Sequence, residues 1–343
     1  MERKDGDVRQ LRWFVIASVL FVLTACGKAS QEDVVKDIGK SWGNTKGYEV
    51  TAAMEIKSGG EPRTYDVKVW HTKPDFYRVE VKEQSQEETQ MIVRNKDGVF
   101  VVNPSQAKTY QFQSDWPKQN SQAYLISALA EDIQADKKLQ METSDSEYIL
   151  NAATQHAEKT GITSQRVTID KKTMLPKQVV LTNKEGQEQA KITFNEVKLN
   201  VTHSEEEYAV EKFIKNEEKD EKEPASADIE GMEFQTYYPV LEWDHTKLSD
   251  EKATGATGDE RVILTFEGEK PFTLMQQRAT VDNVAVPVFA PGDLADLGFA
   301  IGAMTEHSLH WEKDGMAFFI ASTTLTQEEM IAVATSVTAG GMK

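Results

Sequence analysis

The most constraining feature of this sequence is a succession of short segments in which apolar and polar residues alternate. In the segment Tyr48–Lys57 every second residue is apolar. Similar short apolar segments recur at Tyr65–Trp70, Phe76–Val81, Thr89–Arg94, Val99–Asn103, Thr109–Phe112, Glu147–Leu150, Ser164–Ile169, Gln178–Thr182, Ala190–Phe194 and Glu196–Leu199. A period of two is typical of a half-buried strand. Consecutive short strands of this kind favour an antiparallel meander over βαβ units.

Two segments with helical spacing accompany these strands. Gln31–Lys46 places Val34, Val35, Ile38 and Trp42 on one face, and Asn120–Ile133 does the same with Tyr124, Leu125, Ala128 and Leu129. The predicted fold class is therefore α+β. We expect a curved antiparallel sheet or unclosed β-barrel whose concave side the helices cover, followed by a smaller C-terminal α+β domain.

The N-terminus has the pattern of a bacterial secretory signal. Basic residues at positions 3, 4, 9 and 12 precede an uncharged run of 13 residues from Trp13 to Ala25. A signal-peptide core is about 7–15 residues long, whereas a membrane-spanning helix needs roughly 20. The run closes on Leu23-Thr24-Ala25-Cys26, which resembles a lipobox. We expect Cys26 to receive a diacylglycerol and to anchor the protein at the outer face of a membrane. The alternative is an uncleaved signal anchor with an incidental cysteine.

The net charge and the cysteine content exclude some classes of partner and one source of stability. The whole chain has 39 basic and 56 acidic residues, and removing residues 1–25 takes away four and three of them, which leaves a net charge of −18. Nucleic acids and anionic lipid headgroups would be repelled by this charge. Cys26 is the only cysteine, so we expect no intramolecular disulfide and stability that comes from packed cores.

The sequence predicts a division into two folded parts. Lys212–Pro224 is dense in charge, poor in apolar residues and ends in proline, which is typical of a linker; an exposed helix with i,i+4 ion pairs is the alternative. The expected organisation is a signal peptide at 1–25, a β-rich domain at 26–215, a linker at 216–226 and a small α+β domain at 227–343.

Turn and cap signals predict the elements of the C-terminal part. Arg261–Gly268 with Pro271–Ala279, and Ser308–Lys313 with Met316–Ser322, are expected hairpins. Thr326 with Glu329 three residues later forms a capping box for a final helix. We expect Met330, Ile331, Ala334 and Val337 on its buried side.

No catalytic motif is present in the sequence. Gly-x-Ser-x-Gly, HExxH, P-loop and GxGxxG patterns are missing, and Cys26 would be acylated. Only His307 and His310 lie close together, in a strand region where they would point to opposite faces. We therefore expect a protein that is not an enzyme and that holds no metal and no cofactor.

Aromatic and methionine side chains cluster in the N-terminal meander. Those that we take as candidates for lining an apolar groove are Met54, Trp70, Phe76, Met91, Phe100 and Phe112. Such a groove between sheet and helices would suit an acyl chain or a hydrophobic segment of a partner. Ordinary core packing is the alternative for the same residues.

A distinctive turn lies between two of the predicted strands. Asp170 and Thr173 are placed to hydrogen-bond the turn backbone, and Leu175-Pro176 fixes the exit from it. With the strands Arg166–Asp170 and Lys191–Val197 this motif resembles the LolA/LolB-like lipoprotein carrier superfamily. It resembles more closely the YdcC/GerS type of sporulation and germination lipoproteins in spore-forming Firmicutes. The likeness covers roughly residues 30–215.

The resemblance implies an unclosed antiparallel barrel and a role in the spore envelope or cortex. Its partners would include an enzyme of spore peptidoglycan remodelling such as a cell-wall amidase. A chain with its own anchor is unsuited to shuttling between membranes, so we expect a non-catalytic anchored protein that binds a protein partner or a lipid-like ligand. A lipid or lipoprotein chaperone with an apolar cavity is the alternative.

Overall fold

The computed structural model describes residues 29–340, without 58–61, 86–88, 114–115, 117–121, 156, 158–160, 215–233, 241–242, 244, 257–258, 280–286 and 299. Cys26, the expected signal peptide and the expected linker at 216–226 lie outside the described residues.

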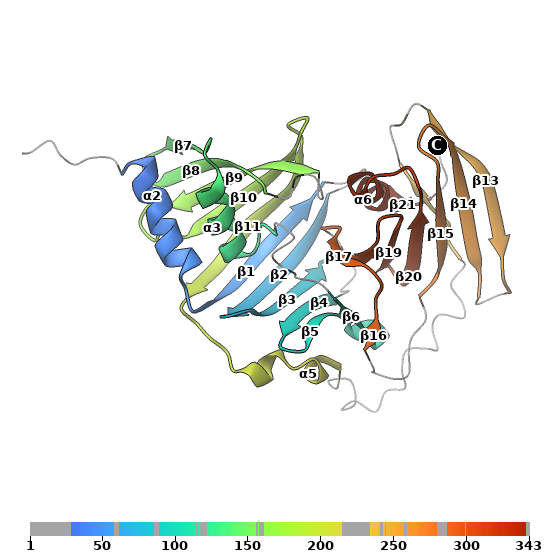
Figure 1. Ribbon diagram of the computed structural model, residues 1–343, viewed down its shortest axis with the longest axis horizontal. Coiled ribbons are helices and arrows are strands. Elements are labelled where there is room, and N and C mark those ends of the chain that lie inside the picture. Colours follow the sequence, from blue (N-terminus) through green and yellow to red (C-terminus); the bar gives the residue numbers. More distant parts are fainter. Residues whose placement is uncertain are drawn as a thin grey trace, which may run out of the picture.

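The larger part of the chain forms one sheet of 12 strands in the order β16-β6-β5-β4-β3-β2-β1-β11-β10-β9-β8-β7 (Figure 1). Their bounds are β1 Gly47–Ile56, β2 Arg63–Thr72, β3 Phe76–Glu83, β4 Thr89–Asn95, β5 Gly98–Asn103, β6 Lys108–Phe112, β7 Gln140–Thr143, β8 Glu147–Ala153, β9 Ile162–Asp170, β10 Pro176–Asn183, β11 Glu188–Leu199 and β16 Val288–Phe289. The edges are β7 and β16, which do not pair with each other. The sheet is therefore unclosed, which confirms the expected fold class.

The strands follow the sequence pattern closely. In β1 buried and half-buried residues alternate from Tyr48 to Ile56, because successive side chains point to opposite faces of a sheet. The two segments expected at 190–194 and 196–199 are one strand, β11. Its register with β1 shifts by one residue between Thr51 and Ala52, so Asn195 is the extra residue of a β-bulge.

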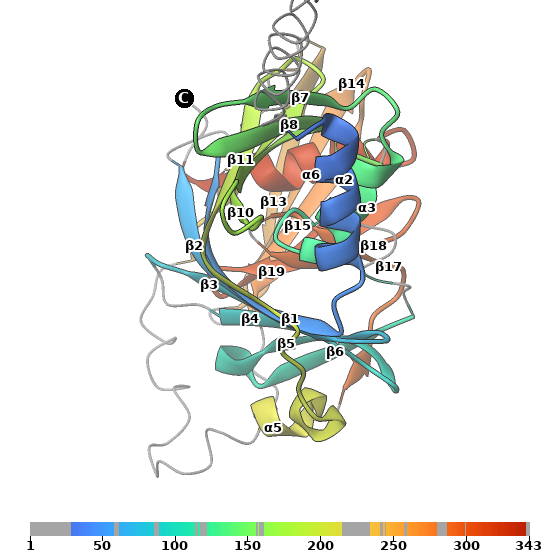
Figure 2. The ribbon, with the colours of Figure 1, turned by 90° about the vertical axis from the view of Figure 1, so that its left-hand side faces the viewer.

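Two helical segments pack against the inner face of this sheet. They are α2 (Gln31–Ile38), which continues as the π-helical turn η1 (Gly39–Gly43), and α3 (Ile126–Ala135). Seen from the side in Figure 2, the sheet curls around α2 and α3. The first helix ends before Lys46. The second begins at Ile126, so Tyr124 and Leu125 precede it rather than lying on its face.

Part of the outer face of the sheet, over β2 to β5, is covered by the segment that follows β11. It includes η3 (Glu205–Tyr208) and α5 (Glu211–Ile214). Tyr208 and Val210 are buried there against strands β4 and β5. A short 3-10 turn, η2 (Pro104–Gln106), joins β5 to β6.

Beyond residue 233 the chain forms a second antiparallel sheet in the order β13-β14-β15-β20-β19-β18-β17, seen at the right of Figure 1. Its strands are β13 Thr246–Thr254, β14 Arg261–Gly268, β15 Phe272–Arg278, β17 Asp293–Asp296, β18 Ile301–Met304, β19 Ser308–Lys313 and β20 Met316–Ala321. A small two-stranded sheet pairs β12 (Tyr237–Pro239) with β21 (Val337–Ala339). Both expected hairpins are present.

The last helix, α6 (Gln327–Ser336), has the predicted capping box. Thr326 Oγ1 accepts a hydrogen bond from the backbone of Glu329, whose carboxylate accepts one from the backbone of Thr326. Met330 and Ala334 are buried, Ile331 is half-buried, and Val337 lies just after the helix. Val333, which the sequence analysis did not single out, is fully buried on the same side.

The two sheets share a core. Ala290, Leu294, Ile301 and Ala303 from the C-terminal part belong to the same apolar cluster as the inner face of the first sheet. The strand β16, also from the C-terminal part, pairs in parallel with β6. These four residues of the C-terminal part therefore pack as part of the first sheet's core.

Trp42 connects η1 to the turn between β9 and β10 of the first sheet. Its indole is fully buried, and Nε1 donates a hydrogen bond of 2.9 Å to the carbonyl oxygen of Met174, in the turn between β9 and β10.

The substitution Trp42→Phe leaves the Met174 carbonyl unpaired, and we expect a loss of about 1–3 kcal/mol in the free energy of unfolding. Urea unfolding followed by circular dichroism measures it. Trp243→Phe, at a half-buried site, is the control, and an equal loss in both variants would contradict the role of Trp42.

Candidate functional site

The six candidate groove residues lie on both faces of the first sheet. Met54 and Phe112 belong to the inner core. Trp70, Phe76, Met91 and Phe100 belong to the cluster on the outer face. They do not form one groove, because neighbouring residues of a strand point to opposite faces and these six side chains divide between the two faces.

The aromatic residues of the outer face pack around a histidine. His203 stacks on Trp70 with ring centroids 4.0 Å apart, and its ring nitrogens lie 3.0 Å from Glu49 Oε1 and 3.1 Å from Glu207 Oε2. Arg78 lies over Trp70 at 4.6 Å from the ring centroid. The cluster fixes the segment after β11 to the sheet.

A first cavity, which we call the β16 cavity, lies where the two sheets meet. Its volume is about 280 Å³, and most of its lining is apolar or aromatic. Side chains that line it include Tyr110, Phe112, Phe289, Trp311 and Phe319. Val288 and Phe289 are 52% and 57% exposed, which is unusual for large apolar side chains beside an apolar cavity.

Glu312, which lines the β16 cavity, is one partner of a buried ion pair. Lys108 Nζ on β6 lies 2.5 Å from Glu312 Oε1 on β19, with both side chains almost fully buried. Tyr110 donates a hydrogen bond of 2.9 Å to the same oxygen, and Asn103 Nδ2 donates one of 3.2 Å to Glu312 Oε2. These partners satisfy a carboxylate that would otherwise be costly to bury.

The hydrogen bonds continue from this carboxylate across both sheets. Gln90 Nε2 donates to Asn103 Oδ1 at 3.0 Å, and the backbone nitrogen of Ile301 donates to Gln90 Oε1 at 2.6 Å. His310 lines the same cavity. Burial lowers the pKa of His310, Glu312 opposes that shift and Lys108 adds to it.

A second cavity, which we call the α6 cavity, lies between the inner face of the first sheet and α6. Its volume is about 260 Å³. The apolar part of its wall comes from Met54, Ile56, Leu181, Ile192, Leu297 and Ile331. Three carboxylates also line it: Glu185, Asp296 and Glu328.

Asp296 is held in place by three donors. Gln122 Nε2 donates at 2.8 Å and Tyr124 at 3.4 Å to Oδ2, and the backbone nitrogen of Gly298 donates at 2.8 Å to Oδ1. Burial raises the pKa of Asp296, while these hydrogen bonds oppose the shift. The carboxylate is therefore fixed between the two parts of the chain.

The described histidines belong to no group of metal-ligating side chains. Among the described residues, no group of three or more His, Cys, Asp or Glu side chains could hold a metal ion. His307 lies just before β19 and His310 within it. His71 is buried, and burial lowers its pKa to about 4.

The turn with the family motif has the expected hydrogen bonds. Asp170 Oδ1 accepts from the backbone nitrogens of Thr173 at 2.8 Å and Lys172 at 3.0 Å. Thr173 Oγ1 accepts from the backbone nitrogen of Leu175 at 3.4 Å. Bonding to Thr173 lowers the pKa of Asp170. The turn presents the Met174 carbonyl to Trp42, so its function in this structure is to position η1.

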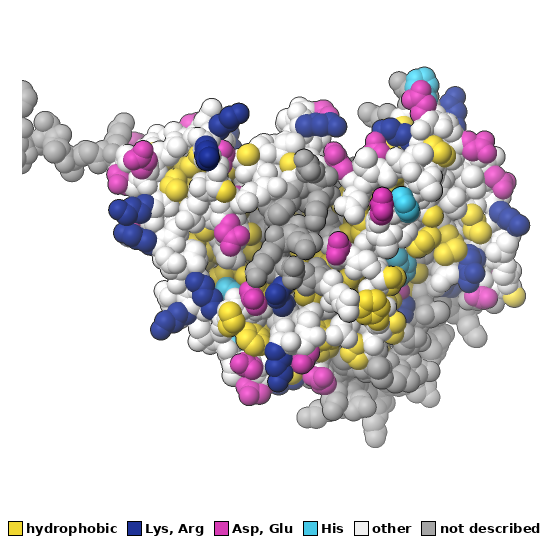
Figure 3. All heavy atoms as spheres, viewed as in Figure 1, with side chains coloured by type: hydrophobic (Ala, Val, Ile, Leu, Met, Phe, Trp, Pro, Cys, Tyr) yellow, Lys and Arg dark blue, Asp and Glu magenta, His cyan; other side chains and the backbone are white. Residues whose placement is uncertain are grey.

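The described helices are all too short or too polar to cross a membrane. Over the face of the molecule drawn in Figure 3, acidic and basic side chains are interspersed among the described residues.

The larger part of the chain is thus one unclosed sheet with helices on its inner face. Residues 9–208 match the family model described as sporulation protein YdcC-like. The chain is 32% identical over 319 residues to sporulation protein YdcC of Bacillus subtilis strain 168, which covers 93% of both chains. The chain therefore belongs to the YdcC-like family of sporulation proteins, which confirms the relationship that the turn motif indicated.

Several solved structures are also similar. The Pseudomonas aeruginosa MucA/MucB complex matches at 12% identity and a TM-score of 0.32, covering 92% of this chain and 100% of the other. The structure of the CwlD amidase from Clostridioides difficile in complex with the GerS lipoprotein matches at 18% identity and a TM-score of 0.30, covering 50% and 96%. A LolA superfamily protein from Nitrosomonas europaea matches at 10% identity and a TM-score of 0.32, covering 54% and 100%.

Sequence reasoning missed the residues that matter most at the junction of the sheets. Lys108, Glu312 and Asp296 are three charges among many, and no local pattern separates a buried carboxylate from an exposed one. Val288 and Phe289 stand in a strand of two residues, which is too short to show a period.

The ion pair at the junction predicts a strong coupling between its partners. Lys108→Met leaves Glu312 buried without its cation, and we expect a loss of about 3–5 kcal/mol in the free energy of unfolding. The double variant Lys108→Met/Glu312→Met is expected to be more stable than Lys108→Met alone, since it also removes the unpaired charge. Urea unfolding of both single variants and the double variant measures the coupling, and strictly additive losses would contradict it.

Proposed function

We propose that this chain is exported, acylated at Cys26 and held at the outer face of a membrane of the sporulating cell. The support is in the sequence: a basic N-terminus, a 13-residue uncharged run that is short for a membrane-spanning helix, and a lipobox-like end at the single cysteine. Membership in a sporulation protein family agrees with this setting.

Cys26→Ser tests the anchor. We expect the variant to lose labelling by a radioactive fatty acid such as palmitate and to lose its lipid-dependent attachment, because the acyl chains are the proposed attachment. Ser30→Ala, four residues later, is the control and should keep both. Fractionation of sporulating cells with fatty-acid labelling measures the outcome, and undiminished labelling of Cys26→Ser would exclude acylation at that residue.

We further propose that the anchored chain is a non-catalytic protein that binds another envelope protein at β16. The observation that carries this proposal is the combination of an exposed edge strand with an apolar cavity beside it. Among the described strands β16 pairs only with β6. Val288 and Phe289 are more than half exposed, and the β16 cavity adjoins them.

An edge strand offers unpaired backbone groups, and a neighbouring pocket accepts alternate side chains of an added strand. The occupant that fits is an extended segment of a partner with a large apolar side chain. The resemblance to YdcC/GerS-type lipoproteins suggests a partner from spore cortex remodelling, such as a cell-wall amidase.

Substitutions on β16 test this contact. Phe289→Asp places a charge at the mouth of an apolar cavity and is expected to weaken partner binding by about tenfold or more. Val240→Asp is the matched control, since Val240 is likewise more than half exposed, at 52%, and lines neither cavity.

A photo-crosslinking residue at position 289 or 240 in sporulating cells identifies the neighbouring proteins. The same crosslinked proteins at both positions would argue against a specific site at β16.

The lipid chaperone is the less supported alternative. Most of the inner face of the first sheet is filled by α2, η1 and α3, with Trp42, Ile126 and Leu129 fully buried. The α6 cavity also adjoins this face, and its three carboxylates disfavour an anionic lipid.

A further inference from the structure

The α6 cavity combines apolar walls with charge of one sign. Its apolar lining comes from four strands of the first sheet (β1, β9, β10 and β11), from Leu297 just after β17 and from α6. Among its lining residues, which are all described, there are three acidic residues and no Lys, Arg or His. The β16 cavity differs, because Lys108 neutralises its carboxylate.

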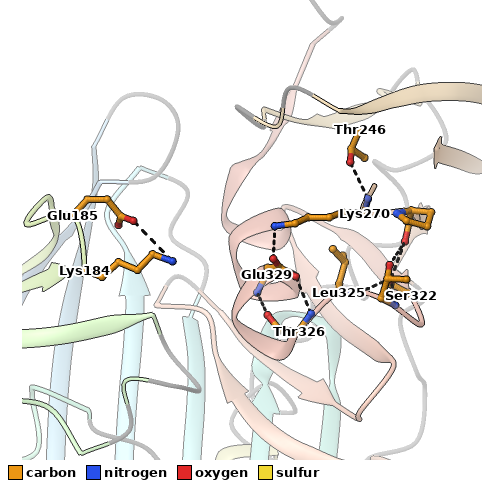
Figure 4. Close-up of polar contacts among 10 residues, drawn as sticks. Lys184, Glu185, Thr246, Lys270, Ser322, Leu325, Thr326 and Glu329 are labelled. Carbon is orange, nitrogen blue, oxygen red and sulfur yellow. Dashed lines mark hydrogen bonds and ion pairs between the residues drawn. The ribbon is translucent and has the colours of Figure 1, made fainter. Parts of the chain in front are cut away.

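The three carboxylates stand on different elements. Glu185 lies in the turn between β10 and β11, Asp296 ends β17, and Glu328 lies in the first turn of α6. Figure 4 shows Glu185 and Lys184 on the side of the gap opposite α6. Lys184 Nζ is 3.9 Å from Glu185 Oε1 with both side chains more than half exposed, so this pair neutralises the rim only weakly.

We propose that the α6 cavity binds a lysine or arginine side chain of a partner protein, carried in an apolar segment. The walls of the cavity would contact the methylene stem and the flanking apolar side chains, while the carboxylates would receive the cationic head. This inference rests on the proposed binding of a partner protein and assigns a second contact to it.

Size and charge together favour a side chain over a membrane lipid. A volume of about 260 Å³ is at or below the lower end of the roughly 300–1,000 Å³ typical of small-molecule sites. It holds one or two side chains rather than a diacyl lipid. The carboxylates repel phosphate and carboxylate headgroups, and a long basic side chain is apolar along its stem and charged only at its tip.

Three peptides that differ at one residue test the proposal. They are acetyl-Gly-Ser-Leu-X-Leu-Ser-Gly-amide with X as lysine, norleucine or glutamate, added to the full-length chain in phosphatidylcholine nanodiscs. The readout is the NMR signal of methionine methyl groups. Met54 lines the α6 cavity, whereas Met91 is equally buried on the outer face of the sheet.

We expect the lysine peptide to shift the Met54 signal and to leave Met91 unchanged. Its affinity should exceed that of the norleucine peptide by about tenfold, and the glutamate peptide should not bind, because a charge in a partly buried site is worth several-fold more than in water. Equal affinity for all three peptides, or shifts without any change at Met54, would overturn the proposal.

Variants test the carboxylates and the volume of the α6 cavity separately. Glu328→Gln should weaken the lysine peptide about fivefold, and Glu306→Gln, which removes an exposed charge outside the cavity, should have no effect. Ala332→Phe keeps every charge and fills the cavity from the exposed side of α6, so it should abolish binding. Retained binding in Ala332→Phe would overturn the proposal.

Two further outcomes distinguish the sources of a cation. Nanodiscs with added dodecylamine should not shift Met54, and a shift there without binding of the lysine peptide would overturn the assignment to a partner protein. If the lysine peptide does not shift the Met54 signal, the proposed contact at β16 is not affected, since Phe289→Asp acts on a different cavity. The two proposals therefore fail separately.

Discussion

The ion pair between Lys108 and Glu312 is the interaction on which the arrangement of the two sheets depends. Neither charge is stable alone in a site that is more than nine-tenths buried. The pair joins β6 of the first sheet to β19 of the second, and Asn103 and Gln90 extend the connection to β18 through Ile301. Movement of one sheet against the other would unpair a buried charge, so the walls of both cavities are held in one geometry.

Local signals in the sequence predicted most of the elements, because their causes are local. The Asp314-Gly315 turn requires positive φ at both residues, and both have it, at 53° and 68°. Thr326 and Glu329 cap α6 with each other's side chains and backbones. Such features depend on residues no more than three positions apart, so one sequence is sufficient to find them.

The site depends on contacts that the sequence does not record. Alternation along β5 separates Phe100 from Val99 and Val101, but it does not say which face lies against the helices. The segment after β11 covers the other face, so apolar residues on either side are buried. The parallel pairing of Val288–Phe289 with β6 joins residues about 180 positions apart. A periodic pattern within a short segment of sequence cannot predict such a pairing.

The two cavities differ in whether a cation compensates the carboxylate that lines them. At β16 Lys108 neutralises the carboxylate of Glu312, to which Tyr110 and Asn103 also donate hydrogen bonds. An apolar and aromatic surface is left for recognition. At α6 the donors to the carboxylate of Asp296 among the described residues are neutral: Gln122, Tyr124 and the Gly298 backbone. A partner that engages both would need an apolar segment for one and a basic side chain for the other.

The proposed anchor restricts how such a partner approaches. Cys26 and Ser30, the N-cap of α2, are separated by four peptide units, which span at most about 15 Å. An acylated Cys26 would therefore keep the start of α2 close to the membrane surface. In Figure 1, α2 and the second sheet stand at opposite ends of the molecule. The second sheet and the cavities beside it would then face away from the lipid, where an extended segment of another envelope protein has access.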